Sequence, residues 1–193
     1  MEEPTRLVGT AGDGGPIRGA QVRAELSETV TARLGAHARV LGVTFGTVVQ
    51  TAWGLLLGRL TGRRDVVFGT TVSGRDVAVP GIEDMVGLCI NTLPTRFRWA
   101  PSDTFSDLLG RVQEEQSRLL GHHHLGLAEV QRLAGPAGSG GLFDTLVVVE
   151  NYPGGTGLAD PSGTVRITGH EFHDAVHYPS RSSSSRDGGS TCA

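Results

Sequence analysis

The feature that most constrains the fold is the segment from Thr44 to Gly62, in which apolar residues do not keep to one side of a helix. Thr44 offers a side-chain oxygen for an N-cap, and Gly62 suits a left-handed C-cap. Between them, apolar side chains occupy nearly every face: Val48, Val49, Ala52, Trp53, Leu55, Leu56, Leu57 and Leu60. Such a helix is expected to be buried on more than one side. The rest of the chain has to provide the elements that cover it.

Hydrophobic periodicity predicts those elements. Alternation of apolar and polar residues, or short β-branched runs, predicts strands at residues 17–26, 65–72, 85–97, 146–149 and 165–168. Helical spacing predicts further helices between Ser27 and Gly42, between Thr104 and Leu120, and at residues 128–133. Strands mixed with helices, without a repeat of fixed period, predict one α/β (α+β) domain with a mixed β-sheet covered by helices.

Composition excludes several classes of partner and location. With 193 residues, 38% of them hydrophobic, the chain is long enough for one sizeable core. A net charge of −3 gives no basic footprint for nucleic acid or for an acidic membrane surface. The acidic start, Met1-Glu2-Glu3-Pro4, lacks the features of a secretory signal, and no apolar run reaches spanning length. We therefore expect a cytoplasmic protein without a membrane partner.

Seven histidines suggest a metal site, but their spacing does not support one. His170-Glu171-Phe172-His173 is one residue shorter than the zincin motif, which places two imidazoles four residues apart on a helix. Cys89 and Cys192 form neither a metal cluster nor a disulfide framework. The chain also lacks a G-x-S-x-G elbow, and residues 135–141 lack the Lys-Ser/Thr of a phosphate loop. We predict no metal.

Two polar clusters lie where an apolar strand ends or is interrupted: Ser73-Gly74-Arg75-Asp76 and Asn91-Thr92. Ligands of open α/β sheets bind in the crevice at strand ends, which favours a binding role. The alternative is structural: Arg75 would cap a loop or form an ion pair, and Asn91 would satisfy backbone groups. Because most buried polar groups are simply hydrogen-bonded structure, the residues alone favour this second interpretation.

At these residues the sequence resembles the condensation domain family of nonribosomal peptide synthetases, which act in secondary metabolite biosynthesis. Residues 65–75 resemble the family's strand and Ser-Gly-Arg loop, and residues 85–96 resemble its Gly-x-Phe-x-Asn-Thr-x-x-x-Arg motif, with Cys89 in place of the aromatic residue. Residues 122–130 resemble its His-Gln-x-x-Pro motif, with Gly126 replacing the proline, and residues 143–153 resemble the next motif. The resemblance runs from Ile17 to Pro179.

The resemblance implies the C-terminal lobe of the two-lobed fold shared with chloramphenicol acetyltransferase. Such domains join a carrier-bound acyl or peptidyl thioester to the amine of a carrier-bound aminoacyl thioester. Both substrates arrive on phosphopantetheine arms through a tunnel between the lobes, so no cofactor bound by this chain is expected. On this basis Ser73, Arg75, Asn91 and Thr92 are expected near the tunnel.

The family's His-His-x-x-x-Asp-Gly signature belongs to the other lobe. His123-His124 is followed by Leu125-Gly126-Leu127-Ala128-Glu129, which lacks the Asp-Gly. The resemblance therefore implies no catalytic residue in this chain.

The ends of the chain depart from the family. We expect a flexible N-terminal segment at 1–14, a partial condensation C-terminal lobe at 15–179, and a disordered Ser/Arg/Gly tail at 180–193. The tail begins where the family has an apolar strand. A GC-rich stretch coding for Leu, Val and Pro yields Ser and Arg runs when read one base out of frame. We therefore hypothesise a frameshifted or truncated gene. Resequencing the locus and translating the neighbouring frames tests this hypothesis.

Three functions remain open from the sequence. The first is a partial condensation domain that is inactive alone. The second is a binding module that docks in trans onto a carrier protein or a separate N-terminal lobe. The third is a small stand-alone acyltransferase. An unpaired lobe is expected to leave apolar surface exposed.

Overall fold

The computed structural model describes residues 4–7, 22–75, 78–134, 141–150, 180–185 and 189–192. Each of the three longer helices begins after a hydroxyl residue that caps it. Helix α1 (Glu28–Val40) follows Ser27, α2 (Phe45–Thr61) follows Thr44, and α3 (Phe105–Leu119) follows Thr104. Helix α2 ends at Gly62 with φ +68°. A short helix η1 (Leu120–His122) and α4 (Leu127–Leu133) complete the helices among these residues.

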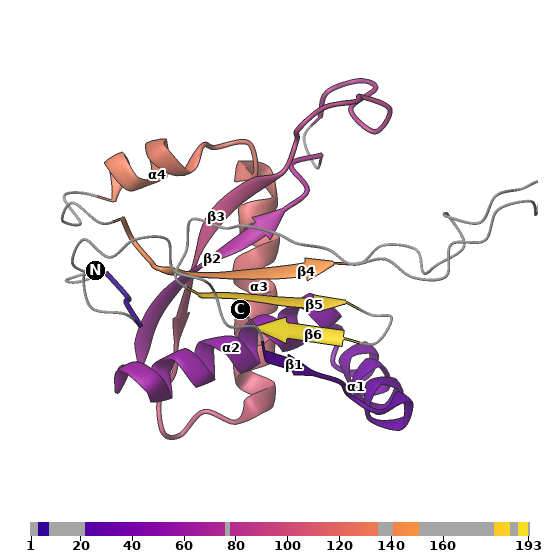
Figure 1. The fold of residues 1–193 in the computed structure, drawn as a ribbon, viewed down its shortest axis with the longest axis vertical. Coiled ribbons are helices and arrows are strands. Elements are labelled where there is room, and N and C mark those ends of the chain that lie inside the picture. The colour runs from indigo at the N-terminus through magenta and orange to yellow at the C-terminus, as the bar shows by residue number, and fades with distance from the viewer. Residues whose placement is uncertain are drawn as a thin grey trace, which may run out of the picture.

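The strands form one mixed sheet, which confirms the predicted fold class (Figure 1). They are β1 (Val22–Ala24), β2 (Asp65–Val72), β3 (Asn91–Arg98), β4 (Thr145–Glu150), β5 (Ser180–Ser185) and β6 (Gly189–Cys192). The spatial order is β1-β6-β5-β4-β2-β3. Strand β4 is parallel to both of its neighbours, β2 and β5, whereas the remaining pairs are antiparallel. Strand β4 therefore lies in the interior of the sheet, as its apolar run predicts.

Helices cover both faces of β2. On one face, Phe68 packs with Leu57 of α2 and Val112 of α3, and α3 runs behind the sheet in Figure 1. Alternation along the strand turns Val67 to the opposite face, where it packs with Phe143 and Leu127 of α4. Helix α2 packs against the sheet through Leu57 and against α3 through Thr47 and Gln50. It is therefore buried on two sides, as expected, whereas Leu56 and Leu60 leave an apolar face exposed.

Helix α2 approaches β3 closely because Gly54 has no side chain. A Cβ atom at Gly54 would lie 2.4 Å from the ring of Phe97, far inside van der Waals contact. The Phe97 side chain is 2% exposed, so its ring has little room to move. This contact fixes the distance between the helix and the sheet.

The structure departs from the sequence-based expectation at both ends of the chain. Within the segment predicted to be flexible, Thr5 is buried, pairs with Phe143 and accepts a hydrogen bond from Val67 N at its Oγ1 (2.8 Å). Within the tail predicted to be disordered, β5 pairs with β4 from Thr145↔Ser180 to Glu150↔Ser185. Composition indicates neither the burial of Thr5 nor the pairing of β5, because main-chain and hydroxyl hydrogen bonds do not require apolar side chains. The predicted strand at 165–168 lies outside the described residues.

In the part of the chain that the structure describes, no single helix is long and apolar enough to cross a membrane. Only α1 and α2 taken together reach that length and composition, and they are bent by 102° at the break between them.

Two glycines in the middle of helices provide a matched test of the α2–β3 contact. We predict that Gly54→Ala lowers the free energy of unfolding by about 1–3 kcal/mol, because the new methyl group overpacks against Phe97. Gly110 of α3 has open space around its Cβ position, so Gly110→Ala is expected to raise stability by about 0.5–1 kcal/mol through helix propensity. Urea unfolding of both variants measures the difference. Equal effects would contradict the close contact.

Candidate functional site

The four residues predicted near the tunnel lie together at one end of the β2–β3 hairpin. Asn91 is paired with Val72 and Thr92 with Thr71, while Ser73 and Arg75 follow directly after β2. The connection between these strands projects beyond the sheet, at the upper right of Figure 1. We call its described residues, 73–75 and 78–90, the arm. The polar motifs therefore form the base of a projection.

At the base of the arm, its two backbone segments come into contact at a glycine. Gly74 has φ +64°, and a Cβ atom there would lie 1.9 Å from the carbonyl oxygen of Cys89. Only glycine fits this conformation and this approach of one backbone to another. Beside it, the backbone N–H of Arg75 donates to Ser73 Oγ (3.3 Å). The Ser-Gly-Arg sequence is thus explained by the geometry of the base.

Arg75 holds the far part of the arm. Its guanidinium donates from Nη1 to the carbonyl of Ile82 and from Nη2 to the carbonyl of Met85 (2.9 Å). Both carbonyls lie in or just after a compact turn, in which Ile82 N bonds Val79 O and Asp84 N bonds Gly81 O. Two of the planar donors of Arg75 therefore bind main chain of the arm itself. These bonds show Arg75 capping the loop, as the structural interpretation expected, and its position near the tunnel stays a prediction.

Asn91 joins the base of the arm to the turn that precedes α4. Its Nδ2 donates to the carbonyls of His123 (2.8 Å) and Leu125 (2.7 Å), and its Oδ1 accepts from the backbone N–H of Thr92 (2.8 Å). Both amide hydrogens are used for these bonds. The half-buried Asn91 is therefore a structural clamp. Thr92, also half-buried, lies beside it as the second residue of β3.

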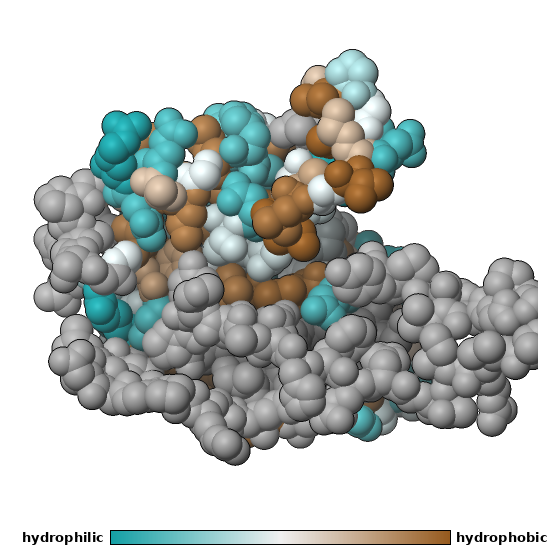
Figure 2. Space-filling model, turned by 45° about the horizontal axis from the view of Figure 1, so that its top comes forward, coloured by the Kyte–Doolittle hydropathy of each residue, from teal (hydrophilic) through white to brown (hydrophobic). Residues whose placement is uncertain are grey.

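The apolar side of the arm was not expected from the sequence. The strand predicted over 85–97 is wrong at its start, because β3 begins at Asn91 and the preceding residues form the projection. Of the fifteen large apolar side chains that are exposed among the described residues, five belong to the arm: Val79, Met85, Val86, Leu88 and Ile90. Figure 2 shows apolar surface gathered on this projection. Pro80, Gly81 and Gly87 are the strand-breaking signals that could have revealed it.

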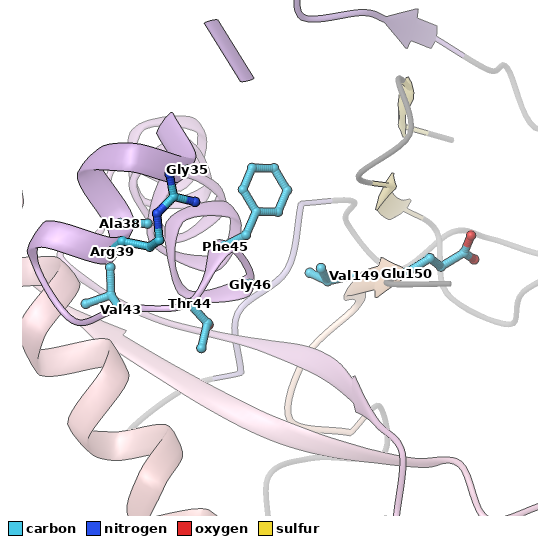
Figure 3. A pocket seen from close by; sticks show the side chains of 9 residues that line it. All are labelled: Gly35, Ala38, Arg39, Val43, Thr44, Phe45, Gly46, Val149 and Glu150. Carbon is cyan, nitrogen blue, oxygen red and sulfur yellow. The ribbon is translucent and has the colours of Figure 1, made fainter. Parts of the chain in front are cut away.

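A cavity of about 400 Å³ lies elsewhere, between α1, the start of α2 and the end of β4 (Figure 3). Its lining residues are Gly35, Ala38, Arg39, Val43, Thr44, Phe45, Gly46, Val149 and Glu150. None of the four predicted residues is among them. No group of three or more metal-binding side chains occurs in the described ranges, and the histidines at 170–177 lie outside them.

Known proteins with similar sequences identify the family of this chain. Residues 12–174 match the condensation domain family. The chain belongs to this family. Among curated relatives, chondramide synthase cmdD of Chondromyces crocatus is 43% identical over 157 residues, which are 81% of this chain and 4% of that protein. Bacitracin synthase 3 of Bacillus licheniformis is 47% identical over 127 residues, which are 66% of this chain and 2% of that protein.

Solved structures confirm the condensation domain fold, which is that of chloramphenicol acetyltransferase. The structure of holo T3CT aligns with this chain with a TM-score of 0.72 and 22% sequence identity. The alignment covers 90% of this chain and 39% of the solved chain. The first condensation domain of the calcium-dependent antibiotic synthetase, in complex with a substrate analogue, aligns with a TM-score of 0.65 and 23% sequence identity. That alignment covers 98% of this chain and 41% of the solved chain. The chain thus spans less than half of these solved chains and a few per cent of the curated synthetases.

The Asn91 clamp generates a prediction about stability. Asn91→Ala leaves two carbonyls and one N–H of the condensation domain without these partners, so we expect a loss of about 1–3 kcal/mol in unfolding free energy. Asn91→Asp is expected to be at least as harmful, because a carboxylate has no hydrogen for the His123 and Leu125 carbonyls. Chemical unfolding measures both. The control Ser117→Ala removes an exposed hydrogen bond and should cost less than about 0.5 kcal/mol. Wild-type stability of Asn91→Ala would instead favour a substrate-binding role.

Proposed function

We propose that this chain contributes the C-terminal lobe of a condensation domain and acts in amide-bond formation only together with an N-terminal lobe. The observation that carries the proposal is the family match over residues 12–174. The solved condensation domains support the lobe assignment, because nearly all of this chain aligns with less than half of each of them. The remaining half is the part that an N-terminal lobe would supply.

The chemistry of amide formation supports the need for a second lobe. A base or an oriented dipole beside the attacking amine is required, and a neutral histidine serves this purpose. The sequence has no His-His-x-x-x-Asp-Gly signature, and the polar groups at the base of the arm are engaged in holding main chain. In this proposal Ser73, Arg75, Asn91 and Thr92 shape one wall of the tunnel through the arm that they support.

The substrates would reach this tunnel on phosphopantetheine arms of carrier proteins in the cytoplasm, and the chain itself would bind no cofactor. Carrier proteins are therefore the second class of partner that we propose.

The arm is the surface that we assign to contact with the N-terminal lobe. Val86 and Leu88 are 104% and 91% exposed, the largest values among the exposed apolar side chains of the described residues. Burying such a side chain contributes roughly 1.5–3 kcal/mol, so its exposure is unfavourable in an isolated lobe. Large exposed apolar patches mark interaction sites. A projection that carries five of these side chains suits insertion against a neighbouring lobe.

Activity provides the direct test. In this proposal, the polypeptide that precedes the matched segment in chondramide synthase would supply the N-terminal lobe. It is mixed with this chain, a carrier-bound donor and a carrier-bound amine acceptor. Intact-mass analysis is expected to show transfer only when both lobes are present. Transfer by this chain alone would overturn the proposal and favour a stand-alone acyltransferase.

A second prediction concerns the arm surface. The double change Val86→Ser and Leu88→Ser is expected to weaken binding of that N-terminal lobe by at least about tenfold, without altering the thermal midpoint of this chain. Val40→Ser on α1 is the matched control, because Val40 is also highly exposed but lies away from the arm. Titration by isothermal calorimetry measures the dissociation constants. Equal affinities for the two variants would remove the arm from the interface.

A further inference from the structure

The arm requires an internal support because its own apolar side chains provide little. Val79, Met85, Val86, Leu88 and Ile90 are all exposed, so they do not form a core that could fix the shape of the projection. Among the described residues of the arm, two local hydrogen bonds define the turn near its tip, at Ile82 and Asp84. A further contact is therefore needed to hold this turn in place relative to β2.

Arg75 provides that connection. It stands where the chain leaves β2, and its guanidinium reaches across the arm to two carbonyls three residues apart, those of Ile82 and Met85. Arginine suits this task because its donors are held in a planar fork, whereas the lysine ammonium is a single compact charge. The bond to the Ile82 carbonyl is partly buried, which reduces competition from water, whereas the bond to the Met85 carbonyl is exposed.

The base is fixed independently. Gly74 allows the two backbones to meet at Cys89, and Asn91 ties the start of β3 to the turn before α4. The base is held in this way. The two Arg75 bonds then fix how residues 82–85 are oriented relative to the base. The apolar residues Val86 and Leu88 follow directly after this part.

We infer that Arg75 is a positioning residue: its guanidinium fork preorganises the arm so that Val86 and Leu88 are presented to the N-terminal lobe. This inference rests on the proposed function, in which the arm binds that lobe. A preorganised loop binds more tightly because less conformational freedom is lost on association. Arg75 therefore acts on affinity through the arm and does not need to contact the substrate.

Hydrogen exchange of the full chain tests the support directly. In Arg75→Gln and in Arg75→Lys, amides between residues 78 and 90 are expected to exchange at least about tenfold faster, while amides of α2 and α3 keep wild-type rates. Arg118→Gln is the control, since Arg118 is an exposed arginine of α3 in a surface ion pair. Gly74→Ala perturbs the same arm from its base without a change in charge and is expected to accelerate the same amides.

Binding of the chondramide synthase N-terminal lobe tests the consequence. Both Arg75 variants are expected to raise the dissociation constant about tenfold at an unchanged thermal midpoint. Wild-type exchange and affinity in Arg75→Lys would overturn the inference, because charge alone would then suffice. Faster exchange throughout the chain would also overturn it, by making Arg75 a general stabilising residue. If wild-type chain does not bind the lobe, the proposed function fails, and the exchange rates still decide whether Arg75 shapes the arm.

Discussion

The contact between Gly54 of α2 and the ring of Phe97 on β3 sets the geometry on which the rest of the structure depends. Because the helix lies directly against the sheet, Trp53 and Leu57 reach the buried residues of β2 and β4. Helix α3 then packs on the same core through Leu108 and Val112. Interiors are packed as densely as organic crystals, so one fixed distance constrains all the neighbouring ones.

A layer of polar side chains sets how α2 and α3 lie against each other. The Oε1 of Gln113 accepts from the backbone N–H of Thr44 (2.9 Å) and from the hydroxyl of Thr47 (2.7 Å), and one turn further along Gln116 donates to Gln50. Thr47 and Gln50 are buried, so these bonds compensate for lost hydration. Apolar contacts alone are not directional, whereas these partners favour one register of the two helices.

In the candidate site, the polar residues have structural roles and the apolar residues are the exposed ones. The polar motif residues, Arg75 and Asn91, are engaged with main chain, whereas the apolar residues around Val86 are left to solvent. In a domain completed by a second lobe this arrangement is reasonable: polar groups with internal partners are inexpensive to bury, and exposed apolar groups supply the binding free energy. The polar motifs are conspicuous in the sequence, although the apolar surface proposed to bind lies between them.

The sequence by itself determined the elements and the family. Capping residues placed the starts of α1, α2 and α3, the β-branched run from Asp65 to Val72 became β2, and local motifs gave the condensation domain family, because these signals depend on neighbours in the chain. Only the tertiary structure decided that residues before Asn91 leave the sheet, that Thr5 is buried beside Phe143, and that a Ser-rich segment pairs with β4. Each of these outcomes depends on a hydrogen-bond partner distant in sequence, and periodicity carries no information about such partners.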